Sequence, residues 1–581
     1  MSEDARPKPL FFVVLAVVIL GLVAYGFRGV LFPRNEAPKP GTISQEELKD
    51  VSGVEAADSN VPTTVKEYVF KPSEKLPPIT QTSAYQSLSA DRTVKFALNV
   101  WSGWAPIILQ NNGGAAGKTW TTPGGQPFKV ELVLIDNPVA MRDAYASGNV
   151  HIGWATLDML PLFMDQFKKD PRIMPRVYQQ VDFSNGGDGI VIRRSAAKDP
   201  NSPTVSDLRG KKVVLAQNSP SEYFLLNALV NGGVQPAEVK FVYTEDAFQA
   251  AAAFNADKSI AACVSWAPDI YNLTELKENH MLVSTATANK LIADVWFARA
   301  DFARDHADIC EGLVRGIFEG MEKMKSEDGK KQAASLMSKL YSIPEADTLG
   351  MLADAHSTNY AENREFFMNQ NNPANFERTW NTAYLLYRKM NRISQAVAFD
   401  QVMDFSIIQK LENEEPFKSS RNEYQINFAP KTVQTIKAEG SEILTKVVTL
   451  HFYPNSWDLR KTITVRENGK DVVKQYEPNA DNVLEEVGKL AAQYGAANIV
   501  VEGHTDASMR GQVSQQMVKE LSGNRAAAVK TEILKKFPNF NANQFSVDGI
   551  GWDRPYDPND PGNHALNRRV EIKVIALENP E

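Results

Sequence analysis

The chain has 581 residues, a formal net charge of −7, 43% hydrophobic residues and 23% charged residues. These are ordinary values for globular proteins, and the length predicts two to four domains. The acidic balance, without any lysine- or arginine-rich block, argues against binding to nucleic acid. Cys263 and Cys310 are the only cysteines, so they provide no disulfide framework.

An uncharged run of 18 residues, 10–27, is the first feature along the chain. It is just long enough to cross a bilayer as a helix. A cleaved signal peptide is the alternative, but no small-x-small cleavage site follows the run. We therefore favour an uncleaved transmembrane anchor, with residues 1–9 in the cytoplasm. Residues 28–90 are rich in Pro, Ser, Thr, Glu and Lys and poor in aromatic residues, which predicts a disordered tether.

Strand-like and helix-like segments alternate through residues 91–405. This alternation is typical of α/β domains with mostly parallel sheets. The clearest strand candidates are residues 94–98, 130–135, 213–216, 239–242 and 261–266, and the clearest helix candidates are 222–230 and 247–256.

A ligand site is expected at the strand ends of this α/β domain, because open α/β sheets bind ligands beyond the carboxyl ends of their strands. Ser219 and Ser221 lie at a helix start, where free N–H groups favour an anionic group, although helix capping explains them equally well. Tryptophans beside aspartates, among them Asp158 and Asp269, suit a cationic or zwitterionic small molecule, and core packing is the alternative for each tryptophan. The candidate solute-binding residues are Trp101, Trp104, Asp136, Trp154, Asp188, Ser219, Ser221 and Trp266.

Six motifs in this region occur in an order that resembles periplasmic substrate-binding proteins of the nitrate, sulfonate and taurine type, which are also similar to thiamine-precursor synthases. They are residues 101–106, 149–154, 187–191, 207–212, 219–221 and 265–268. The resemblance implies a type II fold, in which two α/β lobes joined by two crossovers close on a ligand by hinge bending. We expect lobe one at 92–190 and 297–405, and lobe two at 194–293.

The remainder of the chain is predicted to contain a charged linker, 406–445, and a last domain, 446–581. In that domain residues 499–503 form an apolar run typical of a buried strand, which delivers Thr505 and Asp506 to its carboxyl edge. Residues 521–537 have helical periodicity, and residues 570–575 alternate as a half-buried strand does.

These segments resemble the three signature blocks of an OmpA-like peptidoglycan-binding domain, an α+β fold; the blocks are residues 500–506, 521–526 and 567–572. The resemblance implies that Asp506 pairs with the ammonium group of meso-diaminopimelate in the peptidoglycan stem peptide. It also implies that Arg525 binds the carboxylate of the same meso-diaminopimelate residue. Thr505, Asn567 and Arg568 complete the expected wall-binding site. The alternative is that Asp506 caps a turn and Arg525 is a solvated helix charge.

Motifs of catalysis are absent from the sequence: it has no GxSxG, HExxH, phosphate loop or Cys/His cluster, so we expect no enzyme activity, catalytic residue, metal ligand or cofactor. The wall-binding signature requires the C-terminal bulk to lie in the periplasm of a Gram-negative bacterium, behind a single-pass inner-membrane anchor. The sequence thus predicts a membrane-anchored protein that binds a small solute, attaches to peptidoglycan and serves an unknown membrane protein partner. The alternative is a structural scaffold linking an inner-membrane complex to the cell wall, with a vestigial solute cleft.

Overall fold

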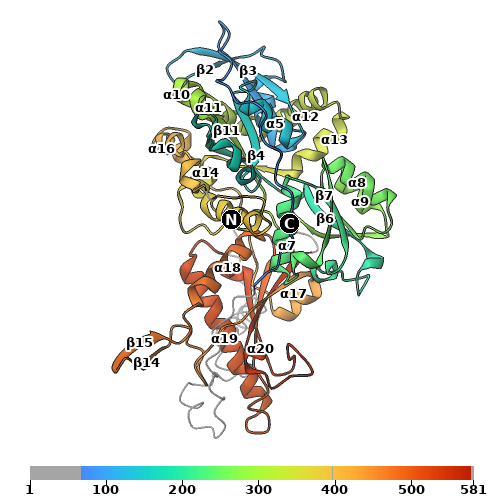
Figure 1. Ribbon diagram of the computed structural model, residues 1–581, viewed down its shortest axis with the longest axis vertical. Helices are drawn as coiled ribbons and strands as arrows, with labels where there is room; N and C mark the ends of the chain where they lie inside the picture. Colours follow the sequence, from blue (N-terminus) through green and yellow to red (C-terminus); the bar gives the residue numbers. More distant parts are fainter. Residues whose placement is uncertain (1–66, 396, 578–581) are drawn as a thin grey trace, which may run out of the picture.

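The computed structural model describes residues 67–395 and 397–577. The predicted cytoplasmic segment 1–9, the predicted anchor 10–27 and most of the predicted tether lie outside the described residues. Among the described residues, none of the helices has the length and apolar character needed to cross a membrane. Figure 1 shows lobe one at the top, lobe two to the right and a C-terminal domain below them.

Lobe one is built on a seven-stranded sheet of order β12-β5-β11-β4-β1-β3-β2. β1 pairs in parallel with β3 and β4, whereas β11 runs antiparallel to β4 and β5. Every residue of β4 is buried, as expected for a strand covered on both faces. The strands are β1 (Thr93–Leu98), β2 (Thr119–Thr121), β3 (Pro127–Leu134), β4 (Ile152–Thr156), β5 (Pro175–Ser184), β11 (Ala293–Arg299) and β12 (Ala355–Ser357).

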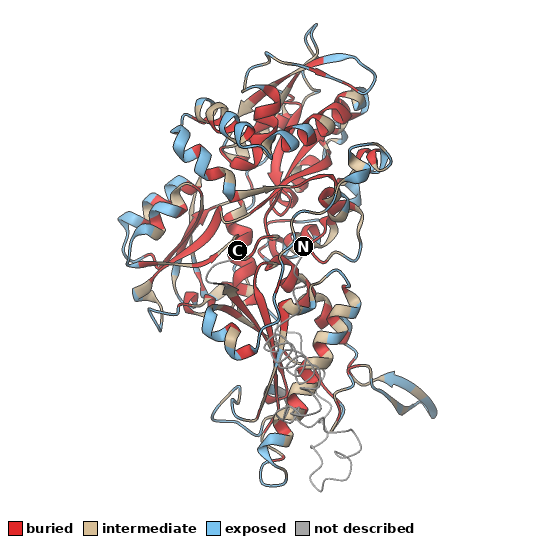
Figure 2. Cartoon of the chain, turned by 180° about the vertical axis from the view of Figure 1, so that it is seen from behind, coloured by how far each residue is buried: buried red, intermediate tan, exposed pale blue. Residues whose placement is uncertain are grey.

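Ten helices of lobe one cover this sheet, and Figure 2 shows their inner faces and the strands as the buried interior. In α11 the buried residues Ile309, Leu313 and Ile317 recur at helical spacing and form one apolar stripe. The helices are α4 (Ala105–Asn111), α5 (Pro138–Ala146), α6 (Met164–Phe167), α10 (Ala300–Asp305), α11 (Ala307–Met324), α12 (Glu327–Tyr341), α13 (Glu345–Met351), α14 (Tyr360–Met368), α15 (Phe376–Lys389) and α16 (Ser406–Leu411).

Lobe two has a five-stranded sheet of order β10-β6-β9-β7-β8. The chain crosses between the two sheets at residues 185–187 and again at residues 285–292. β6 therefore already belongs to lobe two, a few residues before the predicted boundary, because the polar and glycine-containing stretch after β5 is the actual crossover. The elements are β6 (Asp188–Arg193), β7 (Lys212–Ala216), β8 (Lys240–Thr244), β9 (Ala262–Trp266), β10 (Asn279–Ser284), α7 (Pro220–Asn231), α8 (Ala247–Ala256) and α9 (Asp269–Glu275).

The C-terminal domain, residues 433–577, contains a four-stranded sheet of order β13-β18-β16-β17. Only β16 and β17 pair in parallel. A separate hairpin of β14 and β15 projects from the domain, and Asn468 and Gly469 turn it with positive φ values. The elements are α17 (Val433–Glu439), β13 (Gly440–Val448), β14 (Thr462–Glu467), β15 (Lys470–Gln475), α18 (Ala480–Gln493), β16 (Asn498–His504), α19 (Gln515–Lys536), β17 (Phe545–Gly551), α20 (His564–Asn567) and β18 (Val570–Leu577).

The segment 406–445 is not the plain linker that the sequence suggests. Ile408 and Leu411 of α16 are buried, and α16 contacts β5 of lobe one. Ile436 of α17 is buried, and α17 contacts the C-terminal sheet. β13 begins at Gly440, so the predicted boundary at 446 falls inside a strand. Composition does not indicate either helix, because the few apolar residues of each stand among many charged residues.

The described end of the predicted tether, residues 67–90, has no regular secondary structure, yet it is held against lobe one. Buried arginines bind its carbonyl groups: Arg142 donates to Pro77 at 2.8 Å, and Arg299 donates to Ser83 at 2.6 Å. Tyr85 lies edge-on to Phe302, with ring centroids 5.5 Å apart. The predicted disorder is wrong for these residues, because the hydrogen bonds come from partners distant in sequence.

The C-terminal domain contacts lobe two at the end of α18. Asn227 of α7 donates to the side chain of Gln493 at 3.1 Å, and the Gln493 amide donates to the Tyr223 hydroxyl at 3.4 Å. The Gln493 carbonyl accepts from the backbone N–H of Lys290, which lies in the second crossover. The C-terminal domain therefore touches the segment that connects the two lobes.

Lobe one also contacts the C-terminal domain. Arg378 of α15 pairs with Glu485 of α18 at 2.5 Å, and Lys536 pairs with the same carboxylate at 3.1 Å. Between these contacts lies an open cavity of about 1180 Å³, lined by residues of both lobes, of α18 and of β13.

Candidate functional site

A small cavity lies between the two lobes, where strand ends of both sheets meet. Its volume is about 20 Å³, close to the space needed by one water molecule. The two lobes are therefore closed on each other in this structure. The lining residues are Asn99, Trp101, Pro138, Trp154, Thr156, Asp188, Ser219, Pro220, Trp266, Ile292 and Asp294.

Five of the predicted solute-binding residues line this cavity. Trp101 is buried, and its indole N–H donates to Asp182 at 3.2 Å. Trp154 is buried as well, and its indole N–H donates to the Ile135 carbonyl at 3.0 Å. Trp266, half-buried at the end of β9, lines the cavity from lobe two together with Asp188 and Ser219.

Three predicted residues do not line the cavity. Trp104 is fully buried in lobe one, where its indole donates to Asn99 at 2.7 Å and its ring lies edge-on to Phe96. Asp136 is exposed and accepts from the Val100 N–H at 2.6 Å, which holds the loop after β1. Ser221 is buried in the first turn of α7. For Trp104, core packing is the observed role.

A row of buried carboxyl groups, which the sequence interpretation missed in part, borders the cavity. The register between β5 and β11 places Asp182 opposite Asp294, and the register between β11 and β4 places Asp294 opposite Thr156. Asp158 follows the end of β4, and Asp188 begins β6. No local pattern marks Asp182 and Asp294, because sheet pairing alone brings them together.

Burial raises the pKa values of these carboxyl groups. The pKa of Asp188 rises to about 6 and that of Asp182 to about 7, and the values of Asp158 and Asp294 lie well above the usual range. Asp354, which ends a short 3₁₀ helix over residues 352–354, is buried beside them and its pKa rises to about 7. Within residues 67–395 and 397–577, no Lys or Arg forms an ion pair with any of these five groups.

Two polar contacts join the lobes. Arg392, which follows α15, pairs with Glu222 of α7 at 2.7 Å, and both side chains are at most 1% exposed. The Arg392 guanidinium also donates to the Asn218 side chain, and the Tyr243 hydroxyl donates to Glu222 at 3.1 Å. The second contact is a hydrogen bond from the Tyr271 hydroxyl to Asp354.

The predicted wall-binding residues gather at the carboxyl end of β16. Asp506 accepts from the Arg568 guanidinium and from the Ser508 N–H at 2.6 Å, and its Oδ2 lies 3.0 Å from Nδ1 of His564. Burial acts to raise the pKa of Asp506, but the contacts with Ser508 and Arg568 outweigh it, so the pKa is lowered. The negative charge of the Asp506 carboxylate is therefore already balanced by the Arg568 guanidinium.

The other wall-site candidates have different surroundings. Arg525 is buried, donates to the Ser456 carbonyl at 3.0 Å and lies over the Phe452 ring. The Asn567 side chain accepts from the backbone of Tyr556 and donates to two loop carbonyls, so it organises the loop before β18. The buried hydroxyl of Thr505 has no hydrogen-bond partner among the described residues.

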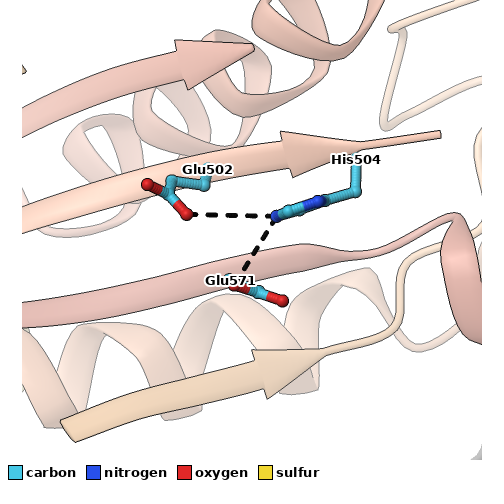
Figure 3. A group of neighbouring side chains, drawn as sticks. All are labelled: Glu502, His504 and Glu571. Atoms are coloured by element: carbon cyan, nitrogen blue, oxygen red, sulfur yellow. Dashed lines mark ion pairs between the residues drawn. The ribbon is translucent and has the colours of Figure 1, made fainter. Parts of the chain in front are cut away.

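Glu502, His504 and Glu571 form a further cluster on β16 and β18, with one possible ligand atom from each lying within 4.8 Å of the others (Figure 3). Metal binding is not expected from the sequence. Basic side chains already compensate both carboxylates: Lys437 and Arg554 pair with Glu502 at 2.6 and 2.5 Å, and Arg569 pairs with Glu571 at 2.6 Å. A metal ion would have to displace these groups.

Comparisons with known proteins agree with this architecture. A family model described as OmpA family matches residues 469–569, and one described as NMT1/THI5 like matches residues 193–329. The taurine-binding periplasmic protein of Escherichia coli (strain K12) is 24% identical over 230 residues, which are 38% of this chain and 67% of that protein.

Two solved structures illustrate the fold neighbours. The periplasmic aliphatic sulphonate binding protein SsuA from Escherichia coli is 18% identical with a TM-score of 0.41, covering 53% of this chain and 96% of that chain. The desulfurization enzyme DSZB is 14% identical with a TM-score of 0.39, covering 55% of this chain and 99% of that chain. The chain thus joins an NMT1/THI5-like domain to a C-terminal OmpA family domain, which confirms both resemblances expected from the sequence.

Proposed function

We propose that this protein is a solute receptor of the bacterial envelope, with the two-lobed domain binding a small molecule and the C-terminal domain attaching to peptidoglycan. In this proposal residues 10–27 anchor the chain in the inner membrane and a membrane protein partner receives the signal or the solute. The proposal assigns no reaction to the cleft. The relative is a taurine-binding periplasmic protein, so a taurine-like solute is the first candidate.

One observation carries the receptor function: buried polar groups without partners converge where the lobes meet. The Thr156 hydroxyl and the Asp158 carboxyl group are buried close to each other, and neither meets hydrogen-bond geometry with any of the described residues. Leaving such groups unsatisfied costs about 1–3 kcal/mol each. A scaffold that kept its lobes permanently closed would lower its free energy by filling this place with apolar side chains, whereas a receptor needs these groups for its solute.

The wall attachment is supported by Asp506, which follows β16 and is contacted by His564 and Arg568, and by the Thr505 hydroxyl, which has no hydrogen-bond partner among the described residues. An ammonium group that takes over Asp506 has to replace the Arg568 guanidinium there. Asp506 is the residue that the sequence motifs assign to the ammonium group, and the same motifs assign the carboxylate to Arg525.

The structural scaffold is the second candidate function, and one observation favours it. The cavity between the lobes measures only about 20 Å³, and the buried pair of Arg392 with Glu222 joins the lobes directly. In a scaffold this closed form is permanent.

Thermal unfolding in the presence of candidate solutes tests the proposal. A solute that binds only the folded state raises the melting temperature as its concentration rises above Kd. We expect Trp154→Ala combined with Trp266→Ala to abolish the rise, and the exposed surface variant Asp257→Asn to retain it. If a broad solute set leaves the melting temperature unchanged, the scaffold function is the better account.

A further inference from the structure

The side-chain charge at the cleft is negative, and the N-terminus of α7, at Ser219 and Pro220, adds backbone N–H groups to its lining. Asp188 and Asp294 line it, and Asp158 and Asp182 are buried near Asp294; each of the four is at most 4% exposed and is an acceptor when ionised. Arg392, at the lobe interface, is already engaged by Glu222 and Asn218. An anionic ligand group would enter beside several carboxyl groups; among the described residues no Lys or Arg lines the cavity, and only the N-terminus of α7 favours such a group.

Two observations besides the carboxyl groups indicate a ligand. The Thr156 hydroxyl is 97% buried, lines the cavity and lacks a hydrogen-bond partner among the described residues. Trp101, Trp154 and Trp266 line the same cavity. Aromatic faces attract cations by about 0.5–2 kcal/mol each, most strongly where water is excluded.

We infer that the cleft selects its solute through a positively charged nitrogen, an alkylammonium group seated against Asp182 and Asp294 between the tryptophans. This inference rests on the proposed function, because it names the ligand chemistry of the same cleft. Each N–H of the group donates to a carboxylate oxygen or to Thr156, and the positive charge offsets the carboxyl row. The sulphonate in the name of a fold neighbour is therefore not the group that decides affinity here.

A bare metal ion fits the cleft less well than an ammonium group. Among the described residues, three ligand atoms close enough for one ion occur only at Glu502, His504 and Glu571. Asp182 and Asp294 lie close together, but no three of the described cleft carboxyl groups bring their oxygens close enough for one ion, which suits a larger polyatomic cation that contacts them through separate N–H groups.

Matched pairs of solutes test the inference by isothermal titration calorimetry with the full-length protein at pH 8. The pairs are taurine with ethanesulfonate, 4-aminobutanoate with butanoate, and 1,4-diaminobutane with 1,4-butanediol. In at least one pair we expect the amine to bind and its nitrogen-free analogue to bind more than tenfold more weakly. Equal binding within every pair that binds overturns the inference and leaves the solute-receptor function standing. Absence of binding by all six compounds overturns both.

A double variant, Asp182→Asn with Asp294→Asn, provides a second test of the inference. We expect it to fold, because it removes two buried carboxyl groups that nothing basic compensates, and cooperative melting checks this. Amine affinity should fall at least tenfold, whereas the exposed-site control Asp257→Asn should bind as the parent does. A folded double variant with parental amine affinity contradicts the inference.

Discussion

Replacing Asp188 by Asn should stabilise the unliganded protein at alkaline pH. Burial raises the pKa of Asp188 from its ordinary 3.8 to about 6 in the folded state. The folded protein therefore binds more protons than the unfolded chain between these two pH values, so stability is lost as pH rises through this window. At about 1.4 kcal/mol per tenfold change in proton affinity, the loss is about 3 kcal/mol above pH 7. Asn cannot ionise, so the variant avoids this loss.

The hydrogen bond to Asp188 survives the substitution, because the Ser184 hydroxyl, which donates at 2.7 Å, can donate to the Asn carbonyl oxygen. Urea unfolding at pH 4, 6 and 8, followed by tryptophan fluorescence, measures the effect. The stability difference between variant and parent should grow by about 2.5 kcal/mol from pH 4 to pH 8, since a small part of the loss has already occurred at pH 4. A difference that does not change with pH would refute the reasoning, since it would mean that a basic group or the solvent compensates the Asp188 carboxylate.

The control is Asp257, an exposed carboxylate whose pKa is lowered by hydrogen bonds from Ser259. Because that pKa is shifted in the opposite direction, Asp257→Asn should give no stability gain at pH 8. A gain in both variants would point to the net charge of the protein instead of to the buried cleft.

Three further predictions concern the contacts between parts of the chain. Arg392→Met leaves the Glu222 carboxylate buried without its partner, so the free energy of unfolding should fall by about 3–5 kcal/mol, and adding Glu222→Gln should restore much of it in urea unfolding. Asp506→Asn should reduce co-sedimentation with purified peptidoglycan sacculi while far-UV circular dichroism stays unchanged; undiminished co-sedimentation would remove Asp506 from the site. Gln493→Ala removes its side-chain bonds to α7, so hydrogen exchange should rise at the backbone N–H of Lys290; unchanged exchange would mean that other contacts hold the C-terminal domain.

Local sequence patterns were sufficient for most of the secondary structure and for the two family resemblances. The apolar runs of β7 and β16 and the periodicity of α8 mark these elements because alternation and helical spacing are properties of neighbouring residues. Motifs of adjacent residues likewise located the OmpA family domain and included Trp101, Trp154 and Trp266, which line the cavity between the lobes.

Only the tertiary structure decided the composition of the cleft. Asp182 and Asp294 meet because β5 pairs with β11, and Arg392 meets Glu222 because α15 lies against α7 of the other lobe. Composition also did not indicate how residues 67–90 and α16 pack, because the residues that they contact lie far away in the sequence. The sequence by itself determined which domains are present, since their signatures are local. The tertiary structure decided which charges are buried together, since burial and register depend on strand pairing across the whole chain.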